Sequence, residues 1–169
     1  AEIWEMCYVN EAFLLGRSIK VDKVLPLKYT ETLEEINVDV GPEIDLFFYG
    51  NLNPRRGKKL ANLAYSFYHK NVSIMWISNI DFDLQKKYIE KSKIILNIHH
   101  TEQFNRQEQP RIFYALINKK CVLSEPSQKN YFGGVIIESE DLVGSVEFLL
   151  KNDRYKHYGE IAYELFKRM

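Results

Sequence analysis

The chain has 169 residues, of which 46% are hydrophobic and 27% charged, and its 23 lysines and arginines balance 23 aspartates and glutamates. This composition predicts an ordinary globular protein and excludes collagen, intrinsic disorder and a disulfide-rich scaffold. The balanced charge argues against nucleic acid as a partner, because proteins that contact many phosphates carry an excess of basic residues. A small anionic ligand remains compatible with it.

The cysteines and the hydrophobic runs indicate the environment of the protein. Cys7 and Cys121 form no CxxC motif and have no neighbouring ligand residues, which is typical of apolar thiols in a reducing compartment. The most hydrophobic runs, residues 44–49 and 93–98, have the length of strands and fall far short of the roughly 20 apolar residues of a transmembrane helix. We therefore expect a soluble, cytoplasmic protein without a transmembrane segment.

Hydrophobic periodicity, punctuated by Gly, Pro and Asn, predicts an alternation of helices and strands. In chain order we expect a helix at 2–16, a strand at 21–27, a helical turn at 30–36, a strand at 43–49, a helix at 55–69, a strand at 72–77, a helix at 82–91, a strand at 93–98, a helix at 111–118, strands at 120–124 and 135–137, and helices at 142–150 and 154–169. Strands separated by helices imply crossover connections between parallel strands. The predicted fold class is α/β, with a mostly parallel sheet between two layers of helices.

Ligands of open parallel sheets bind where the strands end, so the loops after the strands carry the functional signal. The loop after residue 49 begins with Gly50 and Asn51, and Arg55 and Arg56 follow at a helix start. Glycine allows close approach of the backbone, and a helix start attracts anions through its free amides and its dipole. Two arginines there predict a bound phosphate; the alternative is that both are simply solvated.

The polar loop from Asn97 to Arg111 is the second candidate. His99, His100 and Glu102 could be metal ligands, but adjacent histidines point in different directions and no further His or Cys has ligand spacing, so we expect no metal. Glu108 and Arg111, three residues apart, could form an ion pair. Alternatively, Arg111 neutralises a diphosphate that Glu108 helps to orient.

Two later segments complete the candidate site. Glu125 directly follows a strand, where a carboxylate can meet a sugar or ribose hydroxyl, although surface turns also carry glutamate. The segment from Tyr131 to Gly134 could stack on a base or form a plain turn. The motifs GxSxG, HExxH, GxxxxGK[ST], DxDxDG and GxGxxG are absent, which argues against serine hydrolases, zincins, P-loop NTPases, EF-hands and ordinary NAD dehydrogenases.

Three segments carry a resemblance to a known family: "IDLFFYGNLNPRRGKKLANL", "SKIILNIHHTEQFNRQEQPRIFYALINKKCVLSE" and "GGVIIESEDLVGSVEFLL". They resemble the carboxyl-terminal, donor-binding half of a GT-B glycosyltransferase, and within that fold the CgeB-like and group 1 transferases. The middle segment is the most specific. Its features are an Asn-Ile-His strand end, an acidic residue three before an arginine that opens a helix, and a Ser-Glu after the next strand.

The resemblance implies a Rossmann-like donor-binding domain at residues 41–169, preceded by an interdomain helix and connector at residues 1–40. It implies that Arg111, Glu108 and His99 act where the donor reacts, with arginines stabilising the leaving nucleoside diphosphate and no metal or other cofactor. The substrate would be a nucleotide sugar such as a UDP- or GDP-sugar. The donor contacts that it implies are Gly50, Asn51, Arg55, Arg56, Asn97, His100 and Glu125.

One residue departs from the family pattern. Many relatives have Phe-Glu-Ala-Leu in the helix that Arg111 opens, and the glutamate binds ribose, whereas this chain has Tyr114 at that position. The resemblance also implies that an amino-terminal Rossmann-like domain of the same protein holds the glycan acceptor, so we expect this chain alone to bind a donor without transferring sugar.

Two alternatives from other functional classes remain. The first is a Rossmann-like interaction or regulatory module that has lost catalysis, as Tyr114 suggests. The second is a small-molecule isomerase or hydrolase that uses Glu108, Glu125 and His99 as acid and base. The first alternative predicts no affinity for nucleotides, and the second predicts turnover by the chain on its own.

Overall fold

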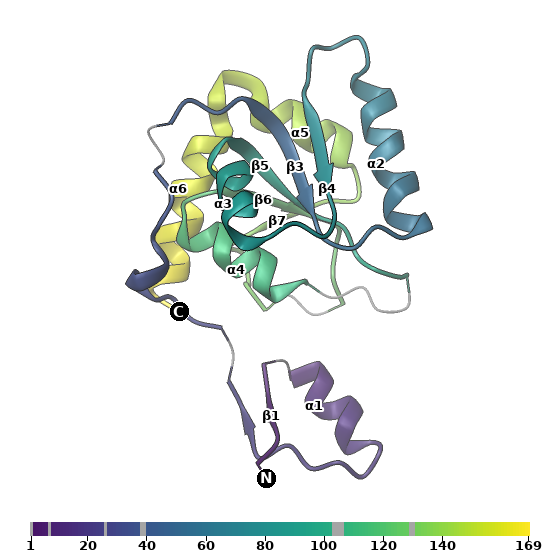
Figure 1. Ribbon diagram of the computed structural model, residues 1–169, viewed down its shortest axis with the longest axis vertical. Helices are drawn as coiled ribbons and strands as arrows, with labels where there is room; N and C mark the ends of the chain where they lie inside the picture. The colour runs from purple at the N-terminus through teal and green to yellow at the C-terminus, as the bar shows by residue number, and fades with distance from the viewer. Residues whose placement is uncertain (1, 7, 26, 38–39, 103–106, 129–130) are drawn as a thin grey trace.

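The computed structural model describes residues 2–6, 8–25, 27–37, 40–102, 107–128 and 131–169 (Figure 1). Its centre is a five-stranded sheet in which every strand pairing is parallel, with the order β4-β3-β5-β6-β7. The strands are β3 (Ile44–Tyr49), β4 (Ile74–Ile77), β5 (Ser92–Asn97), β6 (Cys121–Ser124) and β7 (Ile137–Glu138). The predicted α/β class with a parallel sheet is confirmed.

Helices connect the strands and cover both faces of the sheet, as the crossover rule requires. They are α2 (Pro54–Phe67), α3 (Phe82–Glu90), α4 (Gln109–Ile117), α5 (Leu142–Leu150) and α6 (Arg154–Lys167), with the short 3₁₀ helix η2 (Lys151–Asp153) between the last two. Asn53 accepts a hydrogen bond from the backbone N–H of Arg56 and so caps α2, while Pro54 occupies its first position.

The core has two parts, one on each face of the sheet. Leu46, Phe48 and Ile94 point toward α2 and α5, while Phe47 and Ile95 point toward α3, α4 and α6. This alternation follows from the two-residue period of a strand, and both sets are fully buried because helices cover both faces. The five-stranded sheet and its helices therefore form three layers, α/β/α.

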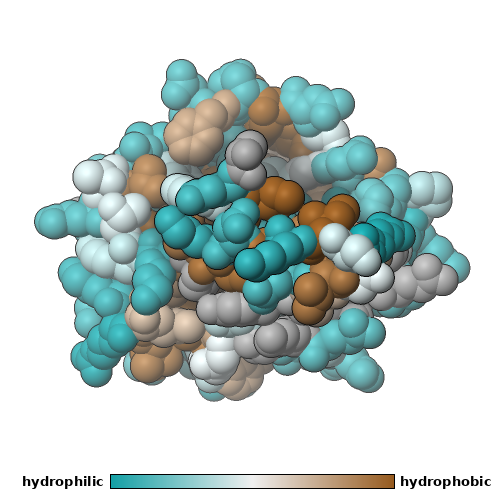
Figure 2. Space-filling model, turned by 90° about the horizontal axis from the view of Figure 1, so that it is seen from below, coloured by the Kyte–Doolittle hydropathy of each residue, from teal (hydrophilic) through white to brown (hydrophobic). Residues whose placement is uncertain are grey.

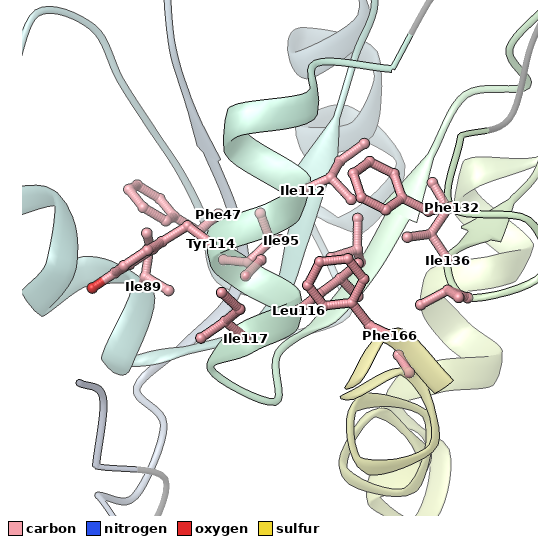
Figure 3. Packing of buried hydrophobic residues seen from close by; sticks show 14 of the residues in the cluster. Phe47, Ile89, Ile95, Ile112, Tyr114, Leu116, Ile117, Phe132, Ile136 and Phe166 are labelled. Carbon is pink, nitrogen blue, oxygen red and sulfur yellow. The ribbon is translucent and has the colours of Figure 1, made fainter. Parts of the chain in front are cut away.

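Helix α4 lies at the centre of the second layer. Figure 3 shows its apolar residues between the sheet and the neighbouring helices, with Ile112 and Leu116 toward Phe132 and Phe166. The ring of Phe132 packs edge-on against that of Phe166, with centroids 5.8 Å apart. Phe132 is thus a core residue and is not available to stack on a base. This packing fixes the position of α4, and with it the position of the polar residues in its first turn.

The amino-terminal segment differs from the prediction. Instead of a helix over residues 2–16, the structure has a short strand β1 (Trp4–Glu5), a helix α1 (Tyr8–Leu15) and a strand β2 (Lys23–Val24) that pairs in parallel with β1. Some of the apolar residues that predicted one helix lie in β1 instead. In so short a stretch, the spacing of apolar residues does not distinguish the period of a helix from that of a strand. Cys7 lies outside the described residues.

The segment that follows β2 packs onto the main domain. The 3₁₀ helix η1 (Glu31–Leu33) and its neighbours lie against α4 through the side chain of Asn118, which accepts from the backbone N–H groups of Glu35 and Ile36 at 2.9 Å. The same side chain donates to the carbonyl oxygen of Leu33 at 3.0 Å. The turn expected at residues 30–36 is present, and a buried asparagine holds it in place.

The smaller differences concern boundaries. The strand expected at 135–137 is β7 (Ile137–Glu138), and Val135 and Ile136 are instead buried in the turn before it. Cys121 is a free, buried cysteine at the start of β6, and burial raises the pKa of its thiol to about 12. That thiol is therefore unreactive at neutral pH, as expected for an apolar side chain.

Candidate functional site

The residues proposed from the sequence lie together at the edge of the sheet where the parallel strands end. Gly50 and Asn51 follow β3, Asn97 ends β5, and Glu125 follows β6. The remaining proposed residues reach this edge from the start of α2, from the segment after β5 and from the start of α4: Arg55, Arg56, His99, His100, Glu108 and Arg111. We call this region the carboxyl edge.

Arg111 lies in the first turn of α4, and its guanidinium group contacts the end of β3. Its Nε donates to the carbonyl oxygen of Tyr49 at 2.9 Å, and its Nη1 donates to Oδ1 of Asn97 at 2.8 Å. Its Nη2 lies against Gly50, where an added Cβ atom would be only 2.5 Å away. Gly50 also has φ of +136°, so both the space and the backbone conformation require glycine.

The charge of Arg111 has no carboxylate to balance it directly. Within the described ranges, no carboxylate oxygen lies within 4 Å of its guanidinium group, and no side chain or carbonyl accepts a hydrogen bond from Nη2. Burial lowers the pKa of Arg111 to about 10, so the group is still protonated at neutral pH. The ring of Phe48, with its centroid 4.8 Å from the guanidinium carbon, provides a cation–π contact.

Arg56 is also turned inward, and only 3% of it is exposed. Its Nε donates to the carbonyl oxygen of Ile98 and its Nη1 to that of Asn51, each at 2.9 Å. Its Nη2 donates to Oε1 of Glu108 at 2.7 Å. Arg56 therefore joins the loops after β3 and β5 to the start of α4. The acidic partner that the sequence offered to Arg111 is paired with Arg56 instead.

Arg55 forms a bidentate ion pair with Glu125. Its Nη1 and Nη2 each lie 2.8 Å from a carboxylate oxygen of Glu125, and Nη1 also donates to the carbonyl oxygen of His99 at 2.9 Å. Lys59, one turn further along α2, lies 3.1 Å from the same carboxylate. Burial alone would raise the pKa of Glu125, but hydrogen bonds from Arg55, from the His99 backbone N–H and from Lys59 lower it to about 2. Glu125 is thus a carboxylate at neutral pH.

The two histidines have different environments. His99 is 1% exposed, and its Nε2 lies 3.0 Å from the carbonyl oxygen of Pro126. His100 is exposed, and its Nδ1 lies 3.2 Å from the side-chain amide of Asn53. The two rings are directed to different partners, as expected for adjacent residues. Within the part of the chain that the structure describes, no group of three or more His, Cys, Asp or Glu could hold a metal ion.

A cleft of about 520 Å³ opens beside Arg111. Tyr49 and Gly50 at the end of β3 line it, and Gln85, Glu108 and Arg111 contribute polar side chains. Its apolar walls come from α3, α4 and the amino-terminal segment: Met6, Leu27, Leu33, Phe82, Pro110 and Phe113. Such a cleft suits a small ligand with an anionic part at Arg111 and a flat or apolar part against the walls.

Tyr114 lines the same cleft one helical turn beyond Arg111. Its hydroxyl donates to Oε2 of Glu35 at 3.2 Å, and Lys86 lies 3.0 Å from that oxygen. Burial raises the pKa of the Tyr114 hydroxyl, so it remains protonated. The tyrosine that departs from the family pattern therefore lines the cleft, and its hydroxyl is bound by a carboxylate from the segment after β2.

Sequence reasoning missed several residues of this edge. Lys59 could have been found, because it follows Arg55 by four positions on a helix and so shares its face. Ser78, which follows β4, donates through its hydroxyl to the carbonyl oxygen of Gly50 at 2.7 Å and fixes the loop after β3. Glu35 has no signal in the sequence, since its place beside Tyr114 results from tertiary packing.

The amino-terminal unit of β1, α1 and β2 leaves much apolar surface exposed. Figure 2, which views the molecule from this end, shows hydrophobic residues among hydrophilic ones. The exposed apolar residues of this unit are Ile3, Trp4, Met6, Phe13, Leu15, Ile19 and Leu25. In the part of the chain that can be described, no helix is both long enough and apolar enough to cross a bilayer.

No family model and no curated protein sequence matches the chain. Among solved structures, it is similar to AviGT4, a glycosyltransferase involved in avilamycin A biosynthesis, with a TM-score of 0.56 and 11% sequence identity. The match covers 98% of this chain and 60% of that enzyme, so the chain spans about three fifths of the length of its structural neighbour. At this identity the similarity shows the fold alone: the chain shares an α/β fold with part of that enzyme.

Proposed function

We propose that this chain is the donor-binding part of a glycosyltransferase and that the cleft beside Arg111 holds a nucleoside diphosphate. The proposal rests on one observation above all. Arg111 is a buried cation at the end of the parallel strands, has no carboxylate partner among the described residues, and leaves Nη2 without an acceptor on the cleft side of Gly50. A buried charge of this kind is costly unless an anion accompanies it.

The surroundings of Arg111 fit a diphosphate. The start of α4 adds the positive end of the helix dipole. Glycine at position 50 leaves room for the Arg111 guanidinium group beside the backbone, and the loop that carries it is fixed by Ser78. The guanidinium group would stabilise the charge that develops on the leaving diphosphate without a metal ion.

The other proposed residues support this site indirectly. Arg56 and Glu108 tie α4 to the loops after β3 and β5, and Arg55 and Glu125 tie α2 to the loop after β6. These four residues are positioning residues in this proposal. The finer relationship to CgeB-like and group 1 transferases rests on the three sequence segments quoted above.

The proposal also concerns the remainder of the enzyme. The chain spans only part of the length of its structural neighbour, so the glycan acceptor and the catalytic base would be held by an amino-terminal Rossmann-like domain of the same protein. The exposed apolar surface of β1, α1 and β2 supports this arrangement, because a two-stranded parallel sheet with one helix cannot form a core alone. Residues 1–40 would then connect two domains.

Calorimetric titration with UDP, GDP, ADP and CMP, and then with the matching nucleotide sugars, tests the proposal. One diphosphate should bind, and Arg111→Met, which keeps an apolar stem without the charge, should weaken it at least about tenfold. Arg168→Met removes an exposed arginine at the far end of α6 and should leave binding unchanged. Thermal unfolding of each variant establishes that it is folded. Binding that is insensitive to Arg111→Met would overturn the assignment of the site.

A second candidate is a module of the same fold that binds no nucleotide. The observation in its favour is that Arg55 and Arg56 are committed to protein partners, which leaves only Arg111 for a diphosphate. This candidate predicts that no nucleotide binds at millimolar concentration. The structure gives less support to an isomerase or hydrolase, because Glu125 and His99 are 5% and 1% exposed and both have protein partners.

A further inference from the structure

A second pocket, of about 380 Å³, lies at the opposite edge of the sheet, where the strands begin. The starts of β5 and β6 and the first turns of α6 line it, together with the residues just before β3. Four lysines contribute to its wall: Lys93, Lys119, Lys120 and Lys156. The glycosyltransferase proposal makes no use of this pocket, which lies at the other end of the strands from Arg111.

Lys120 is the unusual member of this group. It is 8% exposed, and its Nζ donates to the carbonyl oxygen of Glu90 at 2.7 Å and to that of Ser92 at 3.2 Å. None of the described carboxylates lies within 4 Å of Nζ. Burial lowers the pKa of Lys120 to about 8, against the opposing effect of the more distant Glu90 carboxylate. The ammonium group therefore has a third N–H without an acceptor, in the wall of a pocket.

The other three lysines do have carboxylate partners. Lys93 lies 2.7 Å from Asp45, whereas Lys119 lies 3.6 Å from Glu160 and Lys156 lies 3.6 Å from Asp153. The last two pairs are long, and both are at least partly exposed. Such pairs contribute little to stability, so an incoming anion can recruit both lysines at small cost.

After these pairs are counted, one positive charge remains, on Lys120. A buried ammonium group held only by carbonyl oxygens is expensive, and lysine is almost never fully buried without a partner. The carbonyl of Glu90 ends α3, so part of the role of Lys120 is to satisfy a helix end. That role is usually filled by an exposed lysine and does not explain why this one lines a pocket.

We infer that the pocket at the start of the strands, between Lys120, Lys119 and Lys156, binds a small phosphomonoester. Its phosphate accepts the third N–H of Lys120 and recruits Lys119 and Lys156, which gives three charge-assisted hydrogen bonds. The organic part of the ligand lies against Tyr155 and Pro42, the less polar side of the pocket. A volume of this size suits a small ligand and exceeds the need of a bare phosphate ion.

Titrations of the whole chain, followed by ¹⁵N–¹H NMR, test this inference. Inorganic phosphate and phenyl phosphate are the probes, and phenol is the uncharged control. We expect both phosphates to shift backbone N–H signals of Val40, Gly41 and residues 119–121 and 155–160, with phenyl phosphate binding at least about threefold more tightly. Phenol should produce no shift there.

Two variants decide which side chains are responsible. Lys120→Met should weaken phenyl phosphate at least about tenfold, and Lys86→Met, which removes a lysine on α3 outside the pocket, should have no effect. If Lys120→Met does not fold, the double variant Lys119→Gln with Lys156→Gln replaces it, and we expect at least about a fivefold loss. Phosphate binding that is unchanged in the folded variants, or that shifts only other residues, would overturn the inference.

The second site is distinguishable from the first. Arg111→Met should weaken nucleoside diphosphate binding at the carboxyl edge at least about tenfold while phenyl phosphate still binds at the start of the strands with unchanged affinity. If Arg111→Met removed phenyl phosphate binding as well, both ligands would be using one site and the inference of a second would be wrong.

Discussion

Replacement of Gly50 by alanine tests the arrangement of the carboxyl edge. Gly50 has φ of +136°, which costs an alanine about 1–3 kcal/mol. The new Cβ would also lie 2.5 Å from Nη2 of Arg111, so the guanidinium group has to move away from Tyr49 and Asn97. Weakening even one of these charge-assisted bonds costs roughly 1.5–3 kcal/mol. We expect Gly50→Ala to lower the free energy of unfolding by about 3 kcal/mol or more.

Urea unfolding at neutral pH, followed by circular dichroism, measures this loss. The matched control is Gly57→Ala in α2, where an added Cβ would meet no atom within 4 Å. Alanine is a better helix former than glycine, so this control should raise the free energy of unfolding by roughly 0.5–1 kcal/mol. The same glycine-to-alanine change is thus expected to have opposite signs at two positions seven residues apart.

The loss in free energy of unfolding caused by Gly50→Ala has two parts, one from the clash with Arg111 and one from the backbone conformation, and the two can be measured separately. With Arg111→Ala already present, Gly50→Ala should cost only the backbone term, so a double-mutant cycle should give a coupling of about 1 kcal/mol or more between the two positions. A cost that is the same in both backgrounds would show that the guanidinium group is not held against Gly50. A cost below about 1 kcal/mol in the natural chain would refute the whole argument.

Two further predictions concern residues that hold the site together. The Glu125 carboxyl has a pKa of about 2 in the folded chain against about 4.5 when unfolded, so it stabilises the fold by about 3 kcal/mol above pH 4.5, and this is lost as the pH falls toward 2. The stability difference between the natural chain and Glu125→Gln, measured by urea unfolding, should therefore shrink across that range; a constant difference would contradict the ion pair with Arg55. Asn118→Ala should cost roughly 2–3 kcal/mol, because it leaves backbone groups of the segment after β2 without partners. Hydrogen exchange of the Glu35 and Ile36 amides should then become much faster, and unchanged exchange would show that Asn118 does not hold this segment.

The strands at the centre of the sheet could be predicted because their signal is local. β3 and β5 are continuous apolar runs, and such runs are typical of parallel strands buried on both faces. Once the strands are placed, the parallel topology itself brings the residues that follow them to one edge. Gly50, Asn97 and Glu125 could therefore be assigned to one region without knowledge of their contacts.

The partners within that region could not be predicted. Arg55, Arg56 and Arg111 are all arginines near a helix start, yet their partners are Glu125, Glu108 and a carbonyl with an amide. The choice depends on how three loops pack, and no periodicity of the sequence records it. The amino-terminal segment shows the same limit, because its short strands are defined by their pairing with each other.

The two edges of the sheet share one electrostatic feature. At the carboxyl edge, three glutamates pair with three of the basic residues, and the charge of Arg111 is not paired. The paired basic residues are Arg55, Arg56 and Lys59, and the glutamates are Glu102, Glu108 and Glu125. At the other edge, three lysines pair with Asp45, Glu160 and Asp153, and the charge of Lys120 is not paired. In each case the remaining cation is buried and lines a cavity. Each of these two buried cations thus lies in the wall of a cavity, where an anion can be surrounded and where electrostatic attraction is strongest.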